Sequence, residues 1–310
     1  MSIMRSALLW ASANPTLKEK VPKLKFVQKA LKRFMPGENI EDAVIAAKKN
    51  MVDCIPTVFT KLGENLVNLS EAVEVKKHYL GLIEKIANEK INVEVSLKLT
   101  QLGFDLSVED TYRNFIEIVQ NAKTHLHNTV WIDMEGGPYV SKTIEFYKKI
   151  KSEHENVGLC LQAYLFRTHE DLNELLKINP EIRLVKGAYN EPKEIALKDK
   201  FRVDENFIDL SQKMLGAVKE KKMRAVFGTH DLNIIKAIND SAASFGIQKD
   251  QYEFHMLYGI KTSEQKRLAK AGYKVRTLIS YGAAWYPWYM RRLAERPANV
   301  TFVLKNIFSN

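Results

Sequence analysis

The sequence predicts an α/β protein in which eight parallel strands close into a distorted (β/α)8 barrel, preceded by N-terminal helices. Eight short runs rich in valine, isoleucine, leucine and aromatic residues follow one another from residue 57 onward. Longer amphipathic segments, such as 111–123 and 207–222, separate them at the spacing of βα units. The rival fold, an open doubly wound sheet, usually carries a G-x-G-x-x-G fingerprint, and none occurs among the 14 glycines.

There are eight strand candidates, and several of them have a nearly continuous apolar first half. This pattern is typical of strands that are buried on both faces of a parallel sheet. They are TVFTKLG (57–63), VEVSLKL (93–99), VWIDME (130–135), VGLCLQAYL (157–165), IRLVKGA (182–188), MRAVFGTH (223–230), YEFHML (252–257) and KVRTLIS (274–280). Residues 51–310 would thus form the barrel, which we expect to hold the catalytic site, and residues 1–50 a helical arm.

The arm contributes much of the formal net charge of +10. Seven basic residues lie between Lys18 and Arg33, and apolar residues interleave with them at helical spacing, which predicts a basic amphipathic helix. Two interpretations stay open, namely the solvated face of a helix that packs on the core and a contact with a membrane surface. Nucleic acid is not an expected partner, because no aromatic-rich basic sheet is present. The apolar positions are Leu24, Val27, Leu31 and Phe34.

The bulk composition favours a cytoplasmic protein, and a peripheral contact with a membrane surface stays open. No apolar run approaches the roughly 20 residues that span a bilayer, and the start of the chain does not resemble a signal peptide. Cys54 and Cys160 have no metal-ligand spacing, and we expect both to be buried free thiols. The histidines likewise predict no metal site.

Polar side chains gather at the predicted strand ends, which line the active site of a (β/α)8 barrel. So many charged groups on one rim cost desolvation energy unless they serve a ligand. The set includes four lysine and arginine side chains, so we expect an anionic ligand. The residues are Lys98, Asp133, Glu135, Gln162, Arg167, Arg183, Lys186, Thr229, His230, Asp231 and Glu253.

A second group lies in YGAAWYPWYMRRLAERP (281–297). Glu295 is four residues from Arg291 and three from Arg292, so one carboxylate can orient both guanidiniums on a helix. Such a pair can bind a carboxylate through paired hydrogen bonds, although a surface salt-bridge face has the same pattern. The aromatic residues just before it, including Trp288, favour a pocket. The residues alone therefore indicate a barrel enzyme with an anion-binding mouth, but not its reaction.

At these positions the sequence resembles the proline dehydrogenase family. The matching stretches occur in the family's order and cover about residues 57–300. They are VSLKLTQLG (95–103), WIDMEG (131–136), LQAYL (161–165), RLVKGAY (183–189), FGTHD (227–231), EFHMLYG (253–259) and WYPWYMRRLAERP (285–297). The resemblance implies an FAD enzyme that oxidises L-proline to Δ1-pyrroline-5-carboxylate by hydride transfer, the first step of proline catabolism to glutamate. It also implies a quinone as electron acceptor and a separate pyrroline-5-carboxylate dehydrogenase as pathway partner.

The resemblance also assigns roles to single residues. Arg291 and Arg292 would hold the proline carboxylate, Glu295 would orient them, and Lys98 would contribute from the opposite side. Asp133 would help to position the amino group. Arg183 would lie near flavin N5, where a cation can stabilise charge on the reduced ring. The remaining FAD contacts would come from Met134, Gln162, Val185, Lys186, Gly187, Ala188, Thr229 and His230.

Two positions depart from the family pattern. Leu278 stands where the family often has a tyrosine against the substrate ring, and Trp288 replaces a second aromatic residue, often tyrosine. Both would still form apolar walls for the substrate, but a hydroxyproline or another cyclic amine becomes an alternative substrate. Lys98 and Lys186 leave a second alternative, a lyase that forms a Schiff base. A third is a barrel that binds its ligand without turnover.

The Arg291→Lys variant tests the carboxylate clamp. Lysine keeps the positive charge but cannot form the paired hydrogen bonds, so the KM for proline should rise far more than the flavin content falls. Steady-state kinetics and the flavin absorbance of the purified variant measure the two quantities. An unchanged KM would remove Arg291 from the site.

Overall fold

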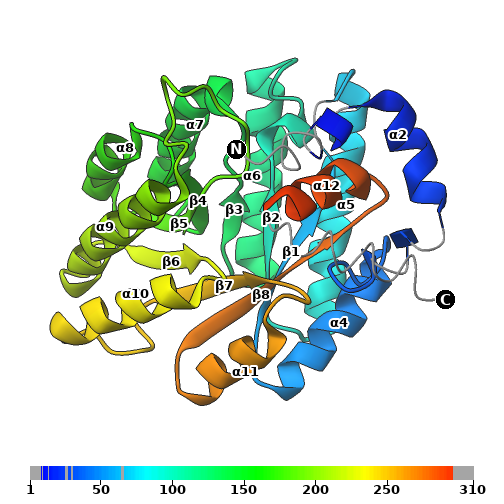
Figure 1. Ribbon diagram of the computed structural model, residues 1–310. Helices are drawn as coiled ribbons and strands as arrows, with labels where there is room; N and C mark the ends of the chain where they lie inside the picture. The colour runs from blue at the N-terminus through cyan, green and yellow to red at the C-terminus, as the bar shows by residue number, and fades with distance from the viewer. Residues whose placement is uncertain are drawn as a thin grey trace.

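The structure is a computed structural model that describes residues 8, 10–12, 14–24, 27–28, 31–63 and 66–295, without the side chains at positions 15, 23, 291, 292, 294 and 295. It contains a closed barrel of eight parallel strands in sequence order, with helices around the outside (Figure 1). The strands are β1 (Thr57–Lys61), β2 (Val93–Leu97), β3 (Val130–Ile132), β4 (Val157–Gln162), β5 (Glu181–Val185), β6 (Arg224–Gly228), β7 (Glu253–Leu257) and β8 (Lys274–Tyr281). The predicted (β/α)8 barrel is therefore confirmed.

A helix follows each strand, and four of these helices begin with a side chain that caps the first turn. Asn68, Ser107, Asp199 and Asp231 each accept a hydrogen bond from a backbone N–H of the helix that they precede. The outer helices are α4 (Ile40–Val52), α5 (Leu69–Asn88), α6 (Val108–His125), α7 (Val140–Glu153), α8 (Thr168–Leu175), α9 (Lys200–Lys219), α10 (Leu232–Ser244), α11 (Thr262–Lys270) and α12 (Trp285–Glu295). Short 3-10 helices are η1 (Val21–Lys23), η2 (Leu99–Leu102), η3 (Gly137–Tyr139) and η4 (Leu176–Ile178).

Strands β1 and β8 close the barrel in parallel register, from Thr57 beside Thr277 to Lys61 beside Tyr281. Alternate residues of each strand face the helices and the interior of the barrel. The helix-facing residues form the main core, whereas Val58, Trp131 and Val226 form a separate cluster inside the barrel. Gly158 makes room for this cluster, since a Cβ there would lie 2.5 Å from the Trp131 ring.

The N-terminal segment is not the single basic helix that the sequence predicts. Helix α2 (Pro15–Lys20) is followed by η1, and Leu24 then adopts an extended backbone and is 43% exposed. Pro22 cannot donate to a continuing helix, which accounts for the break. Val27, Leu31 and Phe34 are buried against Trp285 and Tyr289 of α12, so the core-packing interpretation holds for them.

The boundary at residue 50 stays a prediction. Helix α4 crosses it, and Ala43, Val44 and Ala47 belong to the main core. Just beyond α4, Cys54 is exposed with φ of 57°, in a turn that directs its side chain outward, so the expectation that it is buried was wrong. Cys160 is a buried free thiol, as predicted. None of the described helices is long and apolar enough to cross a membrane.

The amino-terminal end of the barrel is filled by an ion-pair network around Arg224. Its guanidinium lies 2.7 Å from Glu94, 2.9 Å from Glu181 and 2.9 Å from Glu253. Arg276 lies 3.5 Å from Glu94 and 3.4 Å from Glu253. Glu253 is the first residue of β7, so it belongs to this network and the expectation that it lines the catalytic mouth was wrong.

The network predicts a large cost for Arg224→Met. The three carboxylates would lose their closest cation, while Arg276 and Lys151, which lies 3.6 Å from Glu181, are farther away. Breaking a buried pair costs about 3–5 kcal/mol. Chemical denaturation measures the free energy of unfolding. The control is Arg113→Met, which removes a cation paired with Glu109 on the exposed surface of α6. An equal loss in the two variants would contradict the role of the network.

The same network should be acid-sensitive. Burial alone would raise the pKa of Glu253, but contacts with His255 and Arg224 hold it well below its usual value. A lowered pKa in the folded state stabilises the fold above the unfolded pKa of about 4.3, and this contribution is lost as the pH falls. The stability difference between the wild type and Arg224→Met should therefore stay constant from about pH 7 to about pH 5 and shrink as the pH falls further.

Candidate active site

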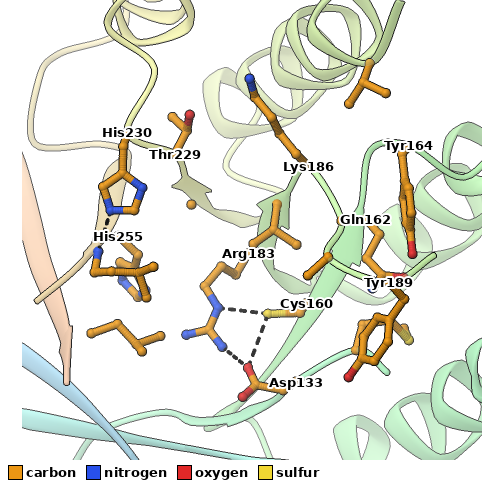
Figure 2. A pocket seen from close by; sticks show the side chains of 18 of the residues that line it. Asp133, Cys160, Gln162, Tyr164, Arg183, Lys186, Tyr189, Thr229, His230 and His255 are labelled. Carbon is orange, nitrogen blue, oxygen red and sulfur yellow. Dashed lines mark hydrogen bonds and ion pairs between the residues drawn. The ribbon is translucent and has the colours of Figure 1, made fainter. Parts of the chain in front are cut away.

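A cavity of about 790 Å³ opens at the carboxyl ends of the strands (Figure 2). Its volume is in the range of roughly 300–1,000 Å³ that is typical of ligand sites. It gathers every residue that the family resemblance assigns to substrate or cofactor and whose side chain the structure describes, and the roles of these residues stay predictions. They are Lys98, Asp133, Met134, Gln162, Arg183, Val185, Lys186, Gly187, Ala188, Thr229, His230, Leu278 and Trp288.

Side chains point alternately to the two faces of each strand, so every second residue points into the barrel. This alternation explains why these side chains converge. On β4, Cys160 and Gln162 both line the cavity while Leu161 between them packs in the outer core, and Arg183 and Val185 repeat the pattern on β5. The sequence analysis missed Cys160 as a site residue. Its position two residues before Gln162 on the same strand is the signal that could have found it.

Arg183 is the central charged group of the cavity and is only 2% exposed. Its Nη2 donates to Asp133 Oδ1, and its Nε donates to Cys160 Sγ at 2.8 Å (Figure 2). Nη2 also donates to Ser96 Oγ at 2.7 Å. The guanidinium carbon lies 4.9 Å from the centre of the Trp131 ring. Nη1 is buried and has no hydrogen-bond partner among the described residues.

Asp133 provides the counter-charge. Its Oδ1 accepts hydrogen bonds from Arg183 and from Ser96 Oγ, the latter at 2.9 Å. An unpaired charge at this depth would be strongly destabilising, so the carboxylate permits a cation inside the barrel. The Asp133 side chain remains 24% exposed toward the cavity and can therefore also meet a ligand.

Gln162 presents a second unsatisfied group. Its side chain is 3% exposed, and its Oε1 has no partner in the described part of the chain. Its backbone is held firmly, because its carbonyl accepts from Thr168 Oγ1 at 2.6 Å. Buried polar atoms without partners are rare in proteins, so Gln162 Oε1 and Arg183 Nη1 together indicate a ligand that meets them.

Lys186 belongs to an ion-pair cluster at the rim of the cavity. Its Nζ lies 3.1 Å from Asp231 and also contacts Asp204, and Lys200 pairs with the same two carboxylates. Although burial alone would raise the pKa of Asp231, the hydrogen bond from Lys186 holds it below its usual value. Such paired surroundings differ from the apolar setting that activates a lysine nucleophile.

His230 and Thr229 fix the backbone between β6 and β7. His230 Nε2 accepts from the Leu257 N–H at 2.7 Å, and Thr229 Oγ1 accepts from the Asp231 N–H at 3.1 Å. The first contact leaves the proton of a neutral His230 ring on Nδ1. Both side chains border the cavity (Figure 2).

A strap of residues 186–199 follows β5 and forms one wall of the cavity. Gly187 begins it with φ of 113°, and a Cβ there would lie 2.2 Å from the Tyr164 ring, so only glycine fits. Glu191 is buried, accepts from the Gly137 N–H at 2.7 Å and lies 3.5 Å from Tyr164 Oη. These contacts hold the strap over the mouth of the barrel.

Two further expectations for the rim were wrong. Arg167 begins α8, is largely exposed, and pairs with Asp171 on the same helix. Glu135 follows β3 but accepts hydrogen bonds from Thr100, so it joins the β2 and β3 loops instead of lining the cavity. In both cases the chain turns after the strand and the alternation of faces ends.

The predicted carboxylate clamp lies outside the described side chains. Arg291, Arg292 and Glu295 belong to α12, whose backbone the structure describes. Trp288 of the same helix lines the cavity, and Trp285 packs in one cluster with Leu62, which follows β1. Helix α12 therefore reaches the mouth of the barrel.

Comparisons with known proteins give a consistent result. The profile of the proline dehydrogenase family matches residues 43–305. Proline dehydrogenase 1 of Bacillus subtilis (strain 168) is 38% identical over 305 residues, which are 98% of this chain and 99% of the relative. Proline dehydrogenase of Deinococcus radiodurans is 35% identical over 310 residues, covering 98% of each chain.

Solved structures share the fold. Proline utilization A (PutA) from Bdellovibrio bacteriovorus, inactivated by N-propargylglycine, aligns with a TM-score of 0.81 at 22% identity. The alignment covers 94% of this chain but only 36% of that chain, so the likeness concerns one part of a larger protein. The family profile and the relatives carry the assignment: this chain belongs to the proline dehydrogenase family.

Proposed function

We propose that this protein is an FAD-dependent enzyme that oxidises L-proline to Δ1-pyrroline-5-carboxylate. The observation that carries the proposal is the pair of buried, partnerless groups Arg183 Nη1 and Gln162 Oε1 in the cavity. Arg183 Nη1 is a hydrogen-bond donor and Gln162 Oε1 is an acceptor. A flavin ring carries both acceptors and donors, so it can pair with both groups. Family membership supports the same assignment.

The residues of the cavity fit FAD. Gln162 would bond to the isoalloxazine, and Arg183 would lie near its N5 edge. Thr229, His230 and the residues from Val185 to Ala188 would hold the rest of the cofactor, with Met134 as a further contact. The bound flavin would supply the hydride acceptor for C5 of proline. Protein groups supply binding, orientation and a favourable charge environment.

Proline would bind between Lys98 and helix α12. Lys98 Nζ donates to the Gly63 carbonyl at 3.3 Å, which directs this cation across the mouth toward the loop after β1. Arg291 and Arg292 would hold the carboxylate with Glu295 orienting them, while Asp133 would help to position the amino group. Leu278 and Trp288 border the same cavity and would form the apolar walls for the ring.

Electrons would then pass to a quinone, and a separate pyrroline-5-carboxylate dehydrogenase would use the product. We place the protein in the cytoplasm, with a peripheral contact to a membrane that holds the quinone. Lys18, Lys20 and Lys32 are exposed, whereas Val27, Leu31 and Phe34 are buried against α12, so the basic side remains available for anionic lipid.

A second candidate substrate is a ring-hydroxylated proline. Ser280 Oγ is buried and lacks a hydrogen-bond partner among the described residues, and it lies beside Thr60 in the strand register. Both residues border the cavity, as does Leu278. A hydroxyl on the substrate ring could satisfy Ser280, and a site with such a polar group can discriminate strongly between analogues.

The first test is the absorbance spectrum of the purified protein without oxygen. Excess L-proline should bleach the long-wavelength band of oxidised flavin, because hydride transfer reduces the ring. Bleaching by 4-hydroxyproline alone would favour the second candidate. A protein that takes up no flavin after incubation with FAD, and that borohydride traps with substrate, would contradict the proposal in favour of a lysine lyase.

The membrane contact has its own test. Changing Lys18, Lys20 and Lys32 to glutamate should reduce co-sedimentation with anionic vesicles, since each basic residue near such a surface contributes about 1 kcal/mol. The buried face of the segment is unchanged, so proline oxidation with a soluble acceptor serves as the folding control. Undiminished sedimentation would exclude this segment as the membrane contact.

A further inference from the structure

Two of the three nitrogens of the Arg183 guanidinium have partners and the third is open. Ser96 and Asp133 hold Nη2, Cys160 holds Nε, and Trp131 covers one face of the group. Nη1 is buried in the cavity wall without a partner among the described residues. The partners of Nε and Nη2 therefore determine the direction in which Nη1 points.

Cys160 closes a triangle with Arg183 and Asp133 (Figure 2). Its Sγ accepts from Arg183 Nε at 2.8 Å and lies 3.6 Å from Asp133 Oδ1, toward which its own proton can point. A thiol can act as donor and acceptor at once, although it is weak in each role. Cys160 is 4% exposed, so water does not replace it.

The thiol is neutral at physiological pH. Burial raises the pKa of Cys160 to about 11, even though Arg183 alone would lower it. The Arg183 cation and the Asp133 anion then cancel, and the triangle carries no net charge. A thiolate in its place would leave a net negative charge beneath the ligand.

An apolar residue at position 160 would change this arrangement. Without the thiol, Nε would be a buried donor with no acceptor, which is costly. The guanidinium could recover that hydrogen bond by turning its Nε–Nη2 edge toward Asp133, since this two-pronged pairing is favourable between arginine and a carboxylate. The same rotation would turn Nη1 away from the cavity.

We propose that Cys160 is a positioning residue that keeps Arg183 Nη1 directed at the bound flavin. The proposal rests on the proposed function, in which Arg183 lies near flavin N5. A cation held there favours the reduced flavin, whose added electrons place negative charge on the ring. Cys160 would thus help to set the reduction potential of the cofactor without touching the substrate.

The test compares Cys160→Val and Cys160→Ser, both in a Cys54→Ser background. Valine has a similar size but accepts no hydrogen bond, whereas serine restores a donor and an acceptor. The chain has 2 cysteines, and Cys54 is exposed on the amino-terminal side of β1, outside the cavity lining, so its replacement removes the only other thiol. The midpoint potential of the bound flavin is measured with a chemical reductant and a reference dye, in the absence of proline.

Cys160→Val should lower the equilibrium constant for two-electron reduction of the flavin about tenfold, the size expected for one hydrogen bond to a charged group, which corresponds to a shift of about 30 mV to more negative potential. Cys160→Ser should restore most of the wild-type value. A wild-type potential in Cys160→Val, or an equal shift in both variants, would overturn the proposal. Thermal unfolding and flavin content show that each variant is folded and loaded.

The two proposals fail in different ways. If proline bleaches the wild-type flavin but Cys160→Val keeps the wild-type potential, the proposed function stands and the role of Cys160 falls. If the potential shifts but proline leaves the wild-type flavin oxidised, the role of Cys160 stands and proline is not the substrate. A protein that binds no flavin at all overturns both.

Discussion

The rest of the structure depends on the contacts of the Trp131 ring, which lies between two guanidiniums inside the barrel. Arg183 lies 4.9 Å from the ring centre and Arg224 lies 5.3 Å from it, and the indole Nε1 donates to Glu94 at 2.6 Å. Gly158 allows the ring to fill the interior. The indole separates two buried guanidiniums that would otherwise repel each other, and cation–π attraction favours both contacts.

The surroundings of Arg224 and of Arg183 differ in how far their polar groups have partners. Around Arg224 three glutamates and Arg276 complete the ion pairs at the amino-terminal end. Around Arg183, by contrast, one guanidinium nitrogen and the Gln162 carbonyl oxygen are left without partners in the described chain. A complete network stabilises the fold, whereas an incomplete one pointing into a cavity favours a ligand, since burying an unsatisfied polar group is costly. This difference locates the candidate site at the carboxyl ends of the strands.

The sequence predicted the eight strands well because each is a short run rich in valine, isoleucine, leucine and aromatic residues, and longer amphipathic segments separate these runs. The same pattern shows which residues share a face but not how far the strand extends, so Glu135 and Arg167 were wrongly assigned to the rim. Glu253 begins its strand and lies at the opposite end of the barrel. The contacts of Cys160 were not predictable, because they join strands far apart in the sequence.

The mouth of the barrel is covered by both ends of the described chain. Val27, Leu31 and Phe34 pack on helix α12, and Trp285 Nε1 donates to Glu38 at 2.9 Å, as Tyr286 Oη does to the Ala11 carbonyl at 3.2 Å. Helix α12 also carries the predicted carboxylate clamp. The N-terminal segment therefore supports the helix that would hold the substrate, so changes in this segment can affect substrate binding as well as any membrane contact.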